Sequence, residues 1–141
     1  MRLGINKNDM KHDVFISHSS KDYELAQAIC EHLELNEVKV WIAPRDLVPG
    51  NSYPSEIING IKNTAVVLLL FSDHSFNSLP VRKEIERAAS LNKTIINFRL
   101  ENITLDDEWE YLISNVHWMN VAGNDYEKYY SNTLLTAMFQ P

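Results

Sequence analysis

The feature that most constrains the fold of this chain is the alternation of short apolar runs with segments of helical periodicity. Five runs are typical of strands, namely Asp13–Ser17, Val38–Ala43, Thr64–Ser72, Lys93–Leu100 and Val116–Val121. A helical pattern follows each of them, at Lys21–Leu35, Ser55–Asn63, Val81–Asn92, Thr104–Ser114 and Asn124–Phe139. Because the strands are apolar almost throughout, they predict a parallel sheet that is covered by helices on both faces.

The predicted topology is a flavodoxin-like α/β sandwich of three layers, with a five-stranded parallel sheet in the order 2-1-3-4-5. In such sheets the ligand crevice lies at the carboxyl ends of the strands, near the point where the strand order reverses. The loops after the first and third strands flank that crevice, and these are His18–Asp22 and Asp73–Pro80. The second loop leads directly into the helix that carries Glu84.

Composition excludes several classes of protein. A length of 141 residues fits one domain, and a net charge of −6 argues against contact with nucleic acid or an anionic membrane. The apolar run Ala65–Phe71 is far shorter than a membrane span, and the first 13 residues lack the apolar core of a secretory signal. The one cysteine, Cys30, cannot form an internal disulfide. We therefore expect a cytoplasmic protein.

Motifs for metal or nucleotide chemistry are missing from the sequence. The five histidines show no metal-binding spacing, and one cysteine cannot build a thiolate site. There is no Walker A loop, no G-x-G-x-x-G and no G-x-S-x-G motif. We therefore expect neither a metal ion nor a cofactor.

Glu84 is the candidate catalytic carboxylate of the predicted crevice. Pro80 suits the first turn of a helix, and Val81, Ile85, Ala88 and Ala89 form its apolar, buried stripe. Glu84 borders this stripe, whereas Glu86 lies about 200° around the helix from Glu84. Position alone leaves two readings open, an ordinary solvated acid, which is the commoner case, and a group that performs chemistry.

Four segments together resemble a bacterial TIR domain. They are "HDVFISHSSKD", "VKVWIAPRDLVPG", "AVVLLLFSDHSFNS" and "VRKEIERA", the last of which fits V-x-x-E-[IL]-x-x-A. The likeness extends from Lys11 to about Phe139, so residues 1–10 are interpreted as an N-terminal extension and 11–141 as the TIR domain. The resemblance implies the same flavodoxin-like sheet.

The resemblance also implies one of two functions. Some TIR domains cleave NAD+ at the nicotinamide–ribose bond, using a glutamate on the helix after the third strand, and Glu84 occupies that position. This favours an NAD+ glycohydrolase or ADP-ribosyl cyclase that is activated by self-assembly in antiphage defence, with NAD+ as substrate. A C-terminal sensor domain, as in STING-like fusions, would then be its natural partner. The alternative is a scaffold that acts through homotypic TIR–TIR contacts. A phosphorylated receiver domain is disfavoured because Asp13 lies at the wrong end of its strand.

Further substrate-binding residues carry over from the family with a structural alternative beside each. Ser17, His18 and Ser19 match the loop that faces the dinucleotide, although a serine there also caps the first helix. Arg45 and Asp46 match the loop after the second strand, where a phosphate contact, an assembly contact or a solvated charge are all compatible with the sequence.

Two aromatic residues complete the predicted site. Tyr53 corresponds to a ring that lies against the ligand in some relatives, and packing within the turn is the alternative. Phe76 would stack on nicotinamide or adenine. The chain departs from many NAD-cleaving relatives at Pro80, where they carry a tryptophan four residues before the glutamate.

Overall fold

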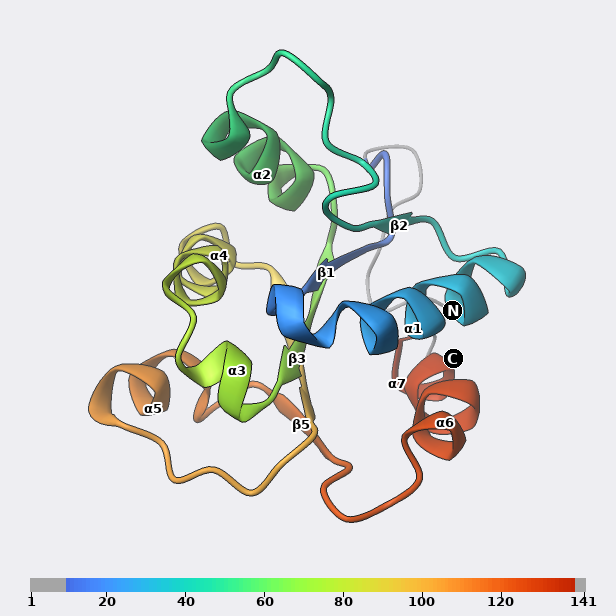
Figure 1. The fold of residues 1–141 in the computed structure, drawn as a ribbon, viewed down its shortest axis with the longest axis vertical. Helices are drawn as coiled ribbons and strands as arrows, with labels where there is room; N and C mark the ends of the chain where they lie inside the picture. Colours follow the sequence, from blue (N-terminus) through green and yellow to red (C-terminus); the bar gives the residue numbers. More distant parts are fainter. Residues whose placement is uncertain (1–9, 139–141) are drawn as a thin grey trace.

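The computed structural model describes residues 10–138 and contains one five-stranded sheet (Figure 1). Its strands are β1 (Val14–Ser17), β2 (Val40–Trp41), β3 (Val66–Phe71), β4 (Thr94–Arg99) and β5 (His117–Asn120). All neighbouring strands are parallel, and their order is β2-β1-β3-β4-β5. The flavodoxin-like prediction is therefore confirmed, although β2 is shorter than its apolar run suggested.

Helices cover both faces of this sheet. The helical segments are η1 (Ser20–Asp22), α1 (Tyr23–Leu35), α2 (Tyr53–Lys62), α3 (Asp73–Phe76), α4 (Leu79–Ser90), α5 (Asp107–Ile113), α6 (Tyr126–Lys128), η2 (Tyr129–Thr133) and α7 (Leu134–Met138). In Figure 1, α1 and the C-terminal helical segments lie on one side of the sheet, and α2, α4 and α5 lie on the other.

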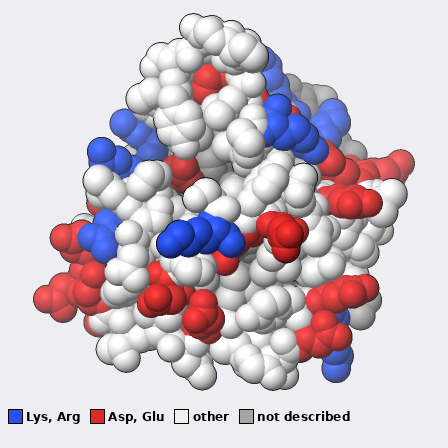
Figure 2. Space-filling view, viewed as in Figure 1, with Lys and Arg blue, Asp and Glu red and all other residues white. Residues whose placement is uncertain are grey.

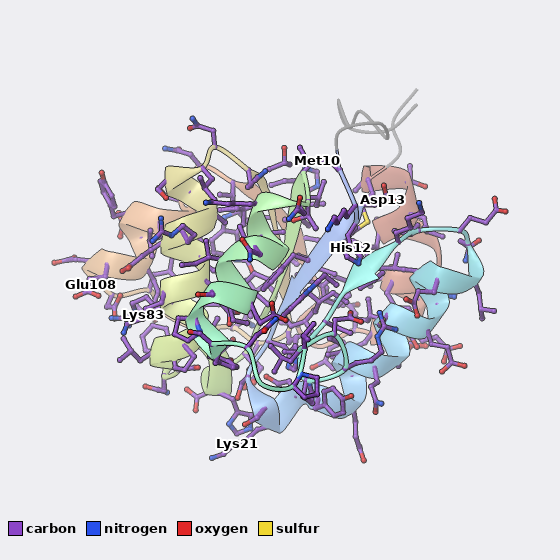
Figure 3. The ribbon with its side chains drawn as sticks, turned by 90° about the horizontal axis from the view of Figure 1, so that it is seen from above. Met10, His12, Asp13, Lys21, Lys83 and Glu108 are labelled. Carbon is purple, nitrogen blue, oxygen red and sulfur yellow. The ribbon has the colours of Figure 1, made fainter. Side chains whose placement is uncertain are left out.

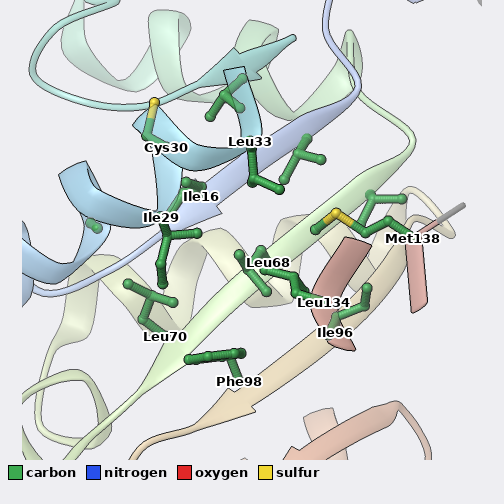
Figure 4. Packing of buried hydrophobic residues seen from close by; sticks show 14 of the residues in the cluster. Ile16, Ile29, Cys30, Leu33, Leu68, Leu70, Ile96, Phe98, Leu134 and Met138 are labelled. Atoms are coloured by element: carbon green, nitrogen blue, oxygen red, sulfur yellow. The ribbon is translucent and has the colours of Figure 1, made fainter. Parts of the chain in front are cut away.

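Alternate residues of the central strands feed two separate cores, as the two-residue period of a strand requires. On one face Leu68, Leu70 and Phe98 pack against α1 and α7 (Figure 4). On the other face Val67 and Leu69 pack against α2, α4 and α5. The central strand β3 is thus buried on both faces, which explains why Val66–Phe71 is apolar without interruption.

Three local predictions were wrong. Ala89, expected on the buried stripe of α4, is exposed. The segment expected to be a loop at Asp73–Pro80 contains the short helix α3, because Ser72 and Ser75 exchange side-chain hydrogen bonds with each other's backbone in a capping box. Helix α2 begins at Tyr53 instead of Ser55, because Pro54 is well suited to a first helical turn.

The C-terminal helix begins at Tyr126 and contains a π-helical stretch, Tyr129–Thr133. The predicted end of this helix at Phe139 lies outside the described residues. Within residues 10–138, no helix combines the length and the apolar character that a membrane crossing needs.

Candidate functional site

A cleft of about 460 Å³ opens at the carboxyl edge of the sheet. It is bounded by the turn after β1, by the loop between β2 and α2, and by the first turns of α4. Figure 3 shows Lys21, in the turn after β1, at the opposite end of the domain from Met10, His12 and Asp13, which precede β1. The cleft thus lies where the strand order predicts a ligand crevice.

Glu84 reaches this cleft because of how α4 begins. Ser78 caps the helix by accepting a hydrogen bond from the backbone N–H of Val81, and Pro80 follows in the first turn. With Val81 and Ile85 buried against the sheet, the intervening Glu84 is half-buried and lines the cleft. Its Oε1 atom accepts a 2.7 Å hydrogen bond from the hydroxyl of Ser17, which is fully buried at the end of β1.

The environment of Glu84 favours its protonated form more than water does. Burial raises the pKa of Glu84 to about 7, against the opposing effect of the Ser17 hydrogen bond, which stabilises the ionised form. Among the described residues, no lysine or arginine lines the cleft. Burial also raises the pKa of the Tyr53 hydroxyl, and the nearby charge of Glu84 adds to this shift.

His18 and Ser19 connect two walls of the cleft, and both line it. Ser19 caps η1 through a hydrogen bond from the backbone N–H of Lys21 to its hydroxyl. The imidazole of His18 lies between two backbone oxygens, with Nδ1 at 2.8 Å from that of Ser19 and Nε2 at 3.1 Å from that of Ala43. This ring therefore holds the turn after β1 against the loop after β2.

Aromatic rings form much of the remaining wall. Phe15 and Trp41 are stacked with ring centroids 4.9 Å apart, and both line the cleft with Tyr53, whose residue surface is 52% exposed. The mid-strand position of Trp41 predicts a core residue, and its exposure of 6% agrees with that. Sequence reasoning missed that its ring also faces the cleft, and the only available signal was its place near the carboxyl end of β2.

Arg45 and Asp46 do not line the cleft. Arg45 instead binds Glu34 at 2.8 Å and donates to the backbone oxygen of Val40 at 2.9 Å. Asp46 accepts from the backbone N–H of Ile42 at 2.9 Å. These bonds fasten the base of the loop after β2, so the predicted substrate contact of both residues stays a prediction.

Phe76 is also directed elsewhere. Its ring contacts Phe71 edge to face at 6.4 Å between centroids, and its backbone oxygen accepts a hydrogen bond from the indole N–H of Trp109. The structure therefore brings Glu84, Ser17, His18, Ser19 and Tyr53 together, and leaves Phe76 outside the cleft lining. No group of three metal-ligating side chains occurs among residues 10–138.

The family of this chain is identified by a match that spans most of its sequence. Residues 14–135 match the model of the TIR domain family. The chain belongs to the TIR domain family. This TIR domain has no match among curated proteins.

Solved structures share the fold of this TIR domain at low sequence identity. The TIR domain of the Toll-related receptor TRR-2 from Hydra magnipapillata has a TM-score of 0.76 and 19% identity, covering 91% of this chain and 98% of that one. A metazoan TIR-STING receptor from C. gigas, in complex with 2',3'-cGAMP, has a TM-score of 0.74 and 17% identity, covering 97% of this chain and 42% of that one. The CMP N-glycosidase BcmB of Clostridium botulinum has a TM-score of 0.63 and 17% identity, covering 87% and 98%.

Proposed function

We propose that this TIR domain cleaves the bond between nicotinamide and ribose in NAD+, with Glu84 as the catalytic carboxylate. The observation that carries the proposal is a half-buried glutamate at the carboxyl edge of the sheet, held by Ser17 and facing a cleft with aromatic walls. Membership of the TIR family supports the proposal. So does the shared fold of a protein described as a CMP N-glycosidase, which breaks the same class of bond.

The chemistry needs one carboxylate and no proton donor. In NAD+ the pyridinium nitrogen is already positively charged, so the C–N bond breaks with its electron pair going to neutral nicotinamide. Positive charge then develops on the ribose, as in glycoside cleavage in general. A carboxylate beside the sugar stabilises that charge most strongly where water is scarce, which is the environment that burial creates around Glu84.

The fate of the ribosyl group sets the product. Attack by water at the anomeric carbon releases a proton and gives ADP-ribose, whereas attack by the adenine ring of the same molecule gives a cyclic product. The exposed ring of Tyr53 provides a flat surface for a base. NAD+ is in this scheme a substrate and no cofactor is needed.

Self-association and biological setting belong to the same proposal. Homotypic TIR–TIR contacts would activate cleavage in the cytoplasm during antiphage defence, in response to a C-terminal sensor domain. A second candidate function is that of a scaffold without catalysis. It is favoured by the loop after β2, whose base is fastened by Arg45 while Val48 is 52% exposed near its tip, as an association surface would require.

The test is nicotinamide release at high protein concentration, followed by chromatography and by the fluorescence of an etheno-NAD+ analogue. Wild type and Glu84→Gln are compared, because glutamine keeps the shape of the side chain and removes its charge. We expect release by the wild type and a loss of at least about 100-fold in the variant. Equal rates in both would remove Glu84 from the mechanism, and CMP in place of NAD+ checks the identity of the leaving base.

A further inference from the structure

The imidazole of His18 lies between two groups that can only accept hydrogen bonds. Its Nδ1 atom is 2.8 Å from the backbone oxygen of Ser19, and its Nε2 atom is 3.1 Å from the backbone oxygen of Ala43. A carbonyl oxygen has no proton to donate. Both ring nitrogens must therefore carry a proton for both contacts to be hydrogen bonds.

The charged form of the ring meets this requirement and the neutral form does not. A neutral imidazole has one N–H, so either tautomer would leave the lone pair of the other nitrogen facing a carbonyl oxygen. The imidazolium has an N–H on each nitrogen, and both of its hydrogen bonds are charge-assisted. Ser19 adjoins His18 in the chain, so the bond to Ser19 survives loss of a proton more readily than the bond to Ala43.

The bond to Ala43 positions the loop between β2 and α2 against the turn after β1. Arg45 fastens the base of this loop to Glu34 of α1. Farther along the loop, the backbone N–H of Val48 donates to the carboxylate of Glu56 in α2 at 2.8 Å. Neither of these bonds reaches the turn after β1, whereas the imidazole bond to Ala43 does. Breaking it separates two walls of the cleft.

Titratable groups face His18 from several elements. In the same turn are Lys21 and Asp22, and the carboxylate of Asp22 accepts a hydrogen bond from the hydroxyl of Ser72. The part of the loop after β2 that lines the cleft has no titratable group, and Figure 2 shows a mostly uncharged surface over α2, at the top of the view. The titratable residues that line the cleft with His18 are Tyr23 of α1, 5.7 Å away between ring centroids, Tyr53 of α2 and Glu84 of α4. Glu84 is the only acid in the described lining, so protonated His18 and ionised Glu84 give it opposite charges.

We propose that protonated His18 is a clamp that positions the loop after β2, and that loss of its proton releases this wall of the cleft. His18 is then a positioning residue, since backbone oxygens occupy both of its ring nitrogens. The effect of the clamp on catalysis rests on the proposed NAD+ cleavage. The loop supplies Leu47 to the cleft and leads into Tyr53, so its release weakens the binding of substrate.

The structural test is nuclear magnetic resonance of the 141-residue chain without substrate, from pH 5 to pH 9. The ring nitrogens of His18 report its protonation, because a charged ring has two N–H nitrogens and a neutral ring has one. We expect the backbone of residues 43–51 to be ordered while His18 carries both protons, and its order parameters to fall in the pH interval in which one proton is lost. A neutral His18 beside an ordered loop, or loop motion that does not follow this titration, overturns the proposal.

His18→Phe separates the clamp from the packing of the ring. Phenylalanine keeps an aromatic ring beside Tyr23 and removes both donors, so the loop should be mobile at every pH. The matched control is His74→Phe, which removes an exposed imidazole of α3 outside the cleft lining and should leave the titration of the loop as in the wild type. Thermal unfolding checks that both variants are folded, and an ordered loop in folded His18→Phe contradicts the clamp.

Catalysis gives a second measurement that a purely structural role would not affect. The KM of the wild type for NAD+ should rise as His18 loses its proton, while kcat changes by less than about twofold. His18→Phe should have a KM about tenfold above that of the wild type at pH 6 and no such pH dependence of KM. A wild-type KM that ignores the titration of His18 refutes the catalytic effect. Absence of cleavage by the wild type refutes the proposed function, and the resonance experiment then decides on the clamp by itself.

Discussion

Replacing Ser17 by alanine tests whether the hydrogen bond to Glu84 sets the acidity of the proposed catalytic group. The Ser17 hydroxyl is fully buried and donates to Oε1 at 2.7 Å. Without it the ionised carboxylate loses a donor, whereas the protonated form loses little, so the pKa of Glu84 rises. Hydrogen bonds to charged groups contribute roughly 1.5–3 kcal/mol, and we take about 1.5 kcal/mol because the cleft admits water to the same carboxylate.

An energy of about 1.5 kcal/mol corresponds to about one pKa unit, so the pKa of Glu84 would rise from about 7 to about 8. The ionised fraction at pH 7 would then fall from about one half to about one tenth. We therefore expect kcat/KM of Ser17→Ala for NAD+ to be about fivefold lower at pH 7 and close to the wild type at pH 9. The assay is nicotinamide release measured from pH 5.5 to pH 9.

The matched control is Ser20→Ala, because Ser20 also lines the cleft and makes no hydrogen bond to Glu84. Its pH profile should coincide with that of the wild type. An unchanged acid limb in Ser17→Ala would refute the reasoning, since the carboxylate would then titrate independently of its donor. A loss of kcat/KM that is equal at every pH would show that Ser17 acts on geometry or folding and has no effect on the ionisation of Glu84.

Three further perturbations follow from the same structure. Glu84 has a folded-state pKa of about 7 against an ordinary value of 4.5, so the stability that it contributes is present below about pH 4.5 and is lost as the pH rises through 7. Glu84→Gln should therefore be more stable than the wild type by about 2 kcal/mol at pH 8 and should lose that advantage at pH 4.5, which denaturant unfolding at both pH values checks. A Cβ atom at Gly60 would lie 2.9 Å from the ring of Trp41, so Gly60→Ala should destabilise the fold by roughly 1–3 kcal/mol, and an unchanged Tm would contradict that close packing. Arg45→Ala removes the ion pair with Glu34 and a bond to backbone and should lower stability by about 1 kcal/mol, while a KM for NAD+ that rises more than about tenfold would instead indicate a substrate phosphate contact.

The sequence predicted the sheet because its signals there are local. The central strand is a continuous apolar run, Val66–Phe71, and helix α4 repeats its apolar residues with a helical period, at Val81, Ile85 and Ala88. Parallel strands with helices between them leave few topologies that bury every apolar face. The order β2-β1-β3-β4-β5 could therefore be predicted from the sequence.

The sequence predicted secondary structure less well in short polar segments. The segment Asp73–Phe76 has a loop-like composition, and it is helical because two serines satisfy each other's backbone. Tyr53 and Pro54 precede the helix predicted from Ser55, although they form the first turn of α2. In the first case two side-chain hydrogen bonds decide the outcome, and in the second Pro54 favours a first helical turn.

By itself, then, the sequence determined the fold, the edge of the sheet where a cleft forms, and the helix on which Glu84 lies. Only the tertiary structure decided that Ser17, 67 residues away, donates to this carboxylate, and that Arg45 and Phe76 turn from the cleft to other partners. The physical reason is that hydrophobic periodicity is a property of neighbouring residues, whereas the solvation and acidity of a side chain depend on atoms that distant segments bring to it.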